Sequence, residues 1–87
     1  MRYRFSTATG TVLQEGEAEM VDIRRRGQQL ARDKGVDVKV HIGPNYRGLL
    51  ELVGTWRPDG LHVNSFGQME RLDPDGRNFS PARDESR

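Results

Sequence analysis

Three short segments of the chain carry the same signal for a tight hairpin turn: Ala8-Thr9-Gly10, Pro58-Asp59-Gly60 and Pro74-Asp75-Gly76. Each segment has glycine where a three-residue hairpin loop needs a positive φ angle. In the second and third segments, proline presets the first turn position and aspartate favours the next. Because such turns join neighbouring strands, they predict a small β-rich globular domain, not a disordered tail or a helical bundle.

The composition predicts one domain with a thin core, because the chain has 87 residues and only 33% of them are hydrophobic. Domains of this size often gain stability from disulfides, a bound metal or a partner subunit. The chain has no cysteine, which excludes disulfides and thiolate metal sites. Only two histidines, His41 and His62, could serve as imidazole ligands, which argues against a structural metal site. A partner subunit is the remaining source of added stability.

The sequence gives no sign of a membrane, a cofactor or a strongly charged partner. No apolar run is long enough for a membrane span, and the N-terminus lacks the apolar core of a signal peptide, so we expect a cytoplasmic protein. The net charge of +1 is too small to indicate nucleic acid or an anionic membrane by itself. No phosphate-binding or other cofactor motif is present, and we predict no cofactor.

The first turn predicts an N-terminal hairpin. Tyr3 and Phe5 alternate with arginines, which is typical of a strand with one apolar face. Thr7 should pair with Thr11 across the turn. Phe5 then lies opposite Leu13, and these two side chains share an apolar face with Tyr3.

A helix should follow, from Glu19 to Lys34, because its apolar positions form a stripe about 100° wide. The stripe consists of Met20, Ile23, Gly27, Leu30 and Ala31. Gly27 lowers helix propensity by about 1 kcal/mol relative to alanine, so we expect it to let the helix approach a sheet closely. Lys34 and Gly35 supply a cation and a left-handed cap at the C-terminal end.

The remaining segments predict strands. Strict alternation from Val36 to Ile42 predicts a half-buried strand. After a loop at 43–48, residues 49–56 and 61–66 should form a hairpin, and 69–72 should pair briefly with 77–79. The order is ββαββ with one further strand, an α+β domain in which one helix packs on one face of a mostly antiparallel sheet. We assign residues 1–79 to this single domain and 80–87 to a frayed C-terminal tail.

The second hairpin has two apolar faces, and one helix can cover only one of them. Pairing Arg57 with Leu61 places four side chains on one face: Leu52, Trp56, His62 and Phe66. One interpretation is that these residues form a contact patch, most simply a twofold self-interface anchored by Trp56. The alternatives are a register shifted by one residue, or a C-terminal segment around Phe79 that folds over the second face.

The predicted helix offers a second candidate surface. One of its flanks has no acid and consists of Arg24, Arg25, Gln28 and Arg32. Arginines in such a row can grip phosphates through forked hydrogen bonds, and Tyr46 beside Arg47 could stack on a base. The alternative interpretation is a solvated helix face and a tyrosine that props its loop.

Catalysis is not indicated. His41 lies on the polar side of its predicted strand and His62 lies near a turn, with no cysteine nucleophile and no triad spacing. The sequence therefore predicts a small, non-enzymatic binding module that acts as a regulator or accessory protein. Its expected partners are a second copy of the chain, in a homodimer, and another protein. The alternative is a nucleic-acid-binding accessory protein that uses the arginine flank of its helix.

Overall fold

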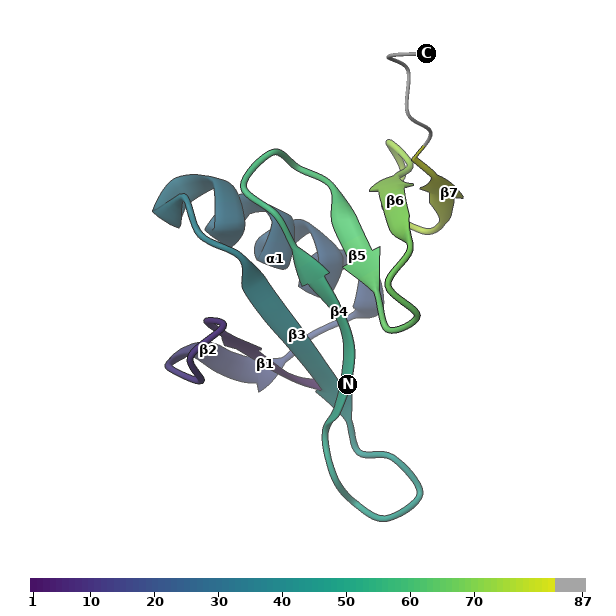
Figure 1. The fold of residues 1–87 in the computed structure, drawn as a ribbon. Helices are drawn as coiled ribbons and strands as arrows, with labels where there is room; N and C mark the ends of the chain where they lie inside the picture. The colour runs from purple at the N-terminus through teal and green to yellow at the C-terminus, as the bar shows by residue number, and fades with distance from the viewer. Residues whose placement is uncertain (83–87) are drawn as a thin grey trace.

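A computed structural model of the chain describes residues 1–82. One helix, α1 (Met20–Lys34), packs on one face of a seven-stranded antiparallel sheet (Figure 1). The strands are β1 (Arg2–Ser6), β2 (Val12–Glu17), β3 (Val38–Gly43), β4 (Glu51–Trp56), β5 (His62–Asn64), β6 (Met69–Leu72) and β7 (Phe79–Pro81). The predicted α+β class is confirmed. Within residues 1–82, no helix has the length and apolar character needed to cross a membrane.

The strand order across the sheet is β2-β1-β3-β4-β5-β6-β7. The chain leaves the edge strand β2, passes through α1 and returns on the other side of β1 as β3. From β3 onward each strand pairs with the next one in sequence. The helix packs mainly on β3 and β4 and leaves the opposite face of the sheet open (Figure 1).

The core lies between α1 and the central strands. Its buried hydrophobic residues are Tyr3, Phe5, Ile23, Ala31, Val38, Val40 and Trp56. Gly27 faces this core, and a Cβ atom there would lie 2.6 Å from Cδ1 and 2.8 Å from Nε1 of Trp56. The predicted role of Gly27 in close helix–sheet approach is therefore confirmed. Gly35 ends the helix in the left-handed conformation at φ 66°, as its sequence position predicts.

The first hairpin has the predicted turn but not the predicted register. The Thr7 amide donates to the Thr11 carbonyl at 2.8 Å, which confirms that pairing. Phe5, however, lies opposite Gln14 and not opposite Leu13, because Leu13 is the extra residue of a β-bulge. Tyr3 consequently lies over Gly16, where a Cβ atom would be 3.1 Å from the tyrosine hydroxyl. Leu13 still packs against the core from its bulged position.

Five turns in the described chain share one hydrogen-bond pattern, in which a glycine amide donates to the carbonyl three residues earlier. Their glycines all have positive φ angles: Gly10, Gly48, Gly60, Gly67 and Gly76. Three of these turns are predicted by the sequence signals above. The other two, at residues 45–49 and 64–68, lack the Pro-Asp pair and begin with Asn45 and Asn64. Asparagine followed three residues later by glycine is the signal that identifies them.

The C-terminal pairing extends further than expected. Leu72 pairs with Phe79, as predicted for the last two segments. β7 continues to Pro81, and the Ala82 amide donates to the Met69 carbonyl at 3.0 Å. Residues 80–82 are therefore paired with the sheet and are not a frayed tail. The rest of the predicted tail, residues 83–87, lies outside the described residues.

Candidate functional site

The hairpin β4–β5 has the predicted register, with Trp56 opposite His62. The predicted shared face is wrong, because β4 contains a bulge at Val53. An extra residue reverses the alternation of side chains, so Leu52 lies on the open face of the sheet while Trp56 lies under α1. Phe66 belongs to the turn after β5 and not to the strand. The structure therefore does not bring these four side chains together as one patch.

Trp56 and His62 are core residues with exposed fractions of 1% and 5%. Phe79 covers them, with its ring centroid 5.8 Å from that of Trp56 and 4.5 Å from that of His62. Phe79 therefore lies on the helix side of the sheet and does not cover the second face, which stays open, so the alternative in which it folds over that face is wrong. Neither Trp56 nor His62 is available on the monomer surface, whereas Leu52 and Phe66 are exposed.

His62 belongs to a hydrogen-bonded polar group on the helix side of the sheet. Its Nδ1 lies 3.2 Å from Oε2 of Glu70, and the Asn64 side-chain amide donates to Oε1 of the same carboxylate at 2.9 Å. Burial lowers the pKa of His62, and the charge of Arg24 lowers it further, although Glu70 acts in the opposite direction. Because an ionised carboxylate only accepts, neutral His62 donates from Nδ1 and keeps a lone pair on Nε2.

The lowered pKa makes stability depend on pH. In the unfolded chain His62 has its ordinary pKa of 6.5, so between the folded and unfolded pKa values the unfolded chain binds more protons. The free energy of unfolding should therefore fall as the pH drops below about 6.5. Urea unfolding at several pH values measures this slope. His62→Gln should reduce it, and a wild-type free energy that is flat or rises on acidification would contradict the neutral, buried state of His62.

The arginine flank of α1 contacts the two Pro-Asp-Gly turns. Nη1 of Arg24 donates to the carbonyls of Gly76, at 3.2 Å, and Arg77. Arg25 donates to the Pro74 carbonyl at 3.1 Å. The contacts with turn 57–61 come from Gln28, which donates to the Gly60 carbonyl at 3.0 Å, and from Arg32, whose guanidinium packs against Gly60. These side chains hold the turns against the helix, a role that sequence reasoning missed.

Two turns at one end of the sheet present exposed aromatic side chains. Oδ1 of Asn45 accepts the amides of Arg47 and Leu49 at 2.8 and 2.9 Å. Oδ1 of Asn64 accepts the amides two and four residues later in the same way, at 2.9 and 3.0 Å. Tyr46 is 88% exposed and Phe66 is 86% exposed.

These two turns are the β3–β4 and β5–β6 connections, which point toward the same end of the sheet, and the β3–β4 connection projects further beyond the strands (Figure 1). The guanidinium of Arg47 lies over the Tyr46 ring, 5.5 Å from its centroid. Leu49 adds an exposed apolar side chain to the same turn. We call these four residues the loop-tip surface: Tyr46, Arg47, Leu49 and Phe66.

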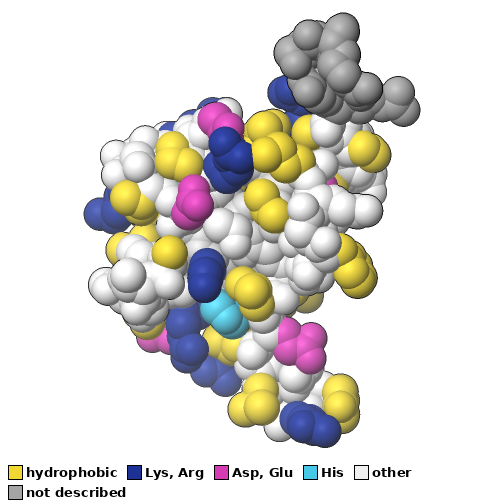
Figure 2. All heavy atoms as spheres, in the orientation of Figure 1, with side chains coloured by type: hydrophobic (Ala, Val, Ile, Leu, Met, Phe, Trp, Pro, Cys, Tyr) yellow, Lys and Arg dark blue, Asp and Glu magenta, His cyan; other side chains and the backbone are white. Residues whose placement is uncertain are grey.

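The open face of the sheet adjoins the loop-tip surface. Figure 2 shows this face, on which histidine atoms (cyan) lie beside basic side chains (dark blue) on one side and hydrophobic side chains (yellow) on the other. His41 pairs with Arg4 on β1 and with Leu52 on β4. Partial burial lowers the pKa of His41, and the charges of Arg4 and Lys39 lower it further. The face is therefore mixed: Lys39 is basic, Arg4 is paired with Glu15 at 2.8 Å, and Leu52 adds an exposed apolar side chain.

Comparison with known proteins finds no matching family model, no similar curated protein and no similar solved structure. Within residues 1–82, no group of three or more histidine, aspartate and glutamate side chains could hold a metal ion.

Proposed function

We propose that this chain is a non-enzymatic module that binds another protein through the loop-tip surface. The observation that carries the proposal is the pair of almost fully exposed aromatic rings, Tyr46 and Phe66, at one end of the sheet. Aromatic and arginine side chains are the residue types that anchor protein interfaces. Both turns are held by asparagine hydrogen bonds, so less conformational entropy is lost when they bind.

The partner we propose is a second copy of the chain. The resulting homodimer would act in the cytoplasm as a regulator or accessory protein. A twofold contact would bring Tyr46 of one copy against Phe66 of the partner subunit, and the symmetry would repeat this pair. The homodimer expected from the sequence then rests on the loop tips and not on Trp56, which is already buried within its own chain. Leu52, exposed on the open face, extends the contact.

The double variant Tyr46→Ala/Phe66→Ala tests this surface. In amide NMR spectra of the wild type at increasing concentration, we expect the signals of residues 45–49 and 64–68 to shift, and the double variant to lose these shifts. Its free energy of unfolding should stay within about 0.5 kcal/mol of the wild type, because both rings are exposed. Val36→Ala is the control, since Val36 is exposed at the other end of the sheet. Shifts that persist in the double variant would contradict the proposed contact.

A second candidate is nucleic-acid binding, favoured by Arg47 over the Tyr46 ring and by Lys39 on the adjoining face, where Arg4 is already paired with Glu15. Arg24 and Arg25 are weaker candidates than expected, because they donate to turn carbonyls. If single-stranded nucleic acid binds here, Arg47→Gln should lower the log–log salt slope by roughly 0.7. Binding that is undetectable at physiological salt would exclude this candidate.

A further inference from the structure

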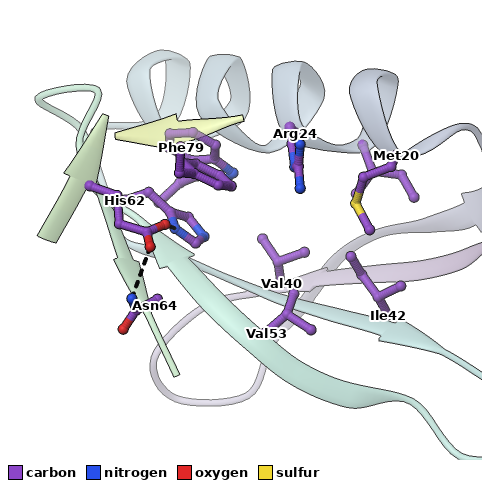
Figure 3. A pocket seen from close by; sticks show the side chains of 11 residues that line it. Met20, Arg24, Val40, Ile42, Val53, His62, Asn64 and Phe79 are labelled. Atoms are coloured by element: carbon purple, nitrogen blue, oxygen red, sulfur yellow. Dashed lines mark hydrogen bonds and ion pairs between the residues drawn. The ribbon is translucent and has the colours of Figure 1, made fainter. Parts of the chain in front are cut away.

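A pocket of about 280 Å³ lies between the first half of α1 and strands β3 to β7. Figure 3 shows Arg24 extending from the helix into this space, between Phe79 and Met20, above Val40 and Val53. The walls are mainly apolar, and the polar groups lie toward the His62 end (Figure 3). The pocket is separate from the loop-tip surface, because none of the four loop-tip residues lines it.

Arg24 is the cation of this pocket. It is half-buried, and within residues 1–82 no ion pair includes it. Nη1 is engaged by the two turn carbonyls, which leaves the donors on Nε and Nη2 for another group. A guanidinium that is partly removed from water is stabilised by an anion that accepts its hydrogen bonds. The charge of Arg24 therefore favours an anionic ligand.

Among the described residues, Glu70 is the only carboxylate that lines the pocket, and it does not supply this anion. Both oxygens of Glu70 are engaged, one by His62 Nδ1 and the other by the Asn64 amide. Nε2 of neutral His62 carries no hydrogen and lies over Gly54, so a ligand's carboxylate gains no donor from it and should bind at Arg24. The remaining walls, including Met20, Ile42 and Val53, suit an apolar group.

We propose that this pocket binds a small amphipathic monocarboxylate, with its carboxylate at Arg24 and its apolar body against Met20, Ile42 and Val53. The volume lies just below the usual range for small-molecule sites, roughly 300–1,000 Å³, so it suits an acid with a single ring or a short chain. This activity goes beyond the proposed protein-binding function and does not depend on it.

Trp56 provides the readout, because it lines the pocket and is the only tryptophan in the chain. Phenylacetate and its neutral isostere phenylacetamide are titrated into the protein while Trp56 fluorescence is followed, with calorimetry as a second measurement. We expect phenylacetate to bind at least about tenfold more tightly, since hydrogen bonds to a charged group are the stronger ones. Equal affinities, or no binding of either compound at millimolar concentration, would overturn the proposal.

Arg24→Gln and Arg25→Gln form a matched pair, because both wild-type side chains donate to the turn at 73–78 but only Arg24 lines the pocket. Arg24→Gln should raise the Kd for phenylacetate about tenfold or more, and Arg25→Gln less than about twofold. Equal losses in the two variants would overturn the assignment of the carboxylate to Arg24. If Arg24→Gln fails to fold, Arg24→Lys keeps the charge and should still bind phenylacetate more tightly than phenylacetamide. Loss of that preference in a folded Lys variant would also contradict the assignment of the carboxylate to Arg24.

Tyr46→Ala/Phe66→Ala should bind phenylacetate as the wild type does, which separates this test from that of the protein-binding surface.

Discussion

Replacing Trp56 with alanine should lower the free energy of unfolding by about 3–5 kcal/mol. The indole is 1% exposed and packs against Gly27 of α1, Phe79 of β7 and His62 of β5. Its removal leaves a cavity at the point where the helix meets three strands, and rigid neighbours cannot collapse to fill it. Since domains of this kind have a total stability of about 5–15 kcal/mol, the variant should be close to unfolding. Urea unfolding followed by circular dichroism measures the change.

Two controls separate this core role from a role in subunit contact. Leu52→Ala removes an exposed side chain from the open face and should change the free energy by less than about 1 kcal/mol. The loss caused by Trp56→Ala should also be independent of protein concentration, because the contacts of Trp56 lie within one chain. If the difference in free energy of unfolding between the wild type and Trp56→Ala grew with protein concentration, Trp56 would be an interface residue.

Gly27→Leu should destabilise the protein by about 2 kcal/mol or more. Leucine raises helix propensity by up to about 1 kcal/mol, but its Cβ would lie 2.6 Å from Cδ1 of Trp56. Because the indole is enclosed by other core residues, the helix must move away from the sheet, and overpacking of this kind costs about 1–3 kcal/mol or more. Thermal unfolding measures the net effect.

Gln29→Leu is the matched control for this variant. Gln29 lies two residues further along α1 on its exposed side, so the same leucine should change the stability by no more than about 0.5 kcal/mol. If Gly27→Leu instead raised the melting temperature, α1 would have to be rotated away from the orientation described above.

The order of the elements could be predicted from the sequence because turns and periodicities are local signals. Glycine at the fourth turn position and alternation in β3 follow from backbone geometry alone. The error of register in the first hairpin and the error of facing in the second both arise at bulges, at Leu13 in β2 and at Val53 in β4. A bulge inserts one residue and exchanges the faces beyond it, and a period-two pattern does not show where that happens.

The functional residues were harder to predict because their roles depend on contacts between distant segments. The spacing of Arg24 and Arg25 shows that they share a flank, but not that turn carbonyls some 50 residues later would accept their hydrogen bonds. Phe66 was predicted as an interface residue on a strand, whereas the turn beginning at Asn64 exposes it at a tip. Tyr46 lies in a turn of the same type, and the asparagine–glycine spacing is the local signal that identifies both.

Light scattering on the wild-type protein is the most direct test of binding through the loop-tip surface. With two exposed aromatic rings on ordered turns, the protein should change from the 9.9 kDa monomer toward a dimer of twice that mass as its concentration rises into the high micromolar range. The Tyr46→Ala/Phe66→Ala variant should keep the monomer mass at the same concentrations. A wild-type protein that keeps the monomer mass throughout this range would contradict self-association through these turns.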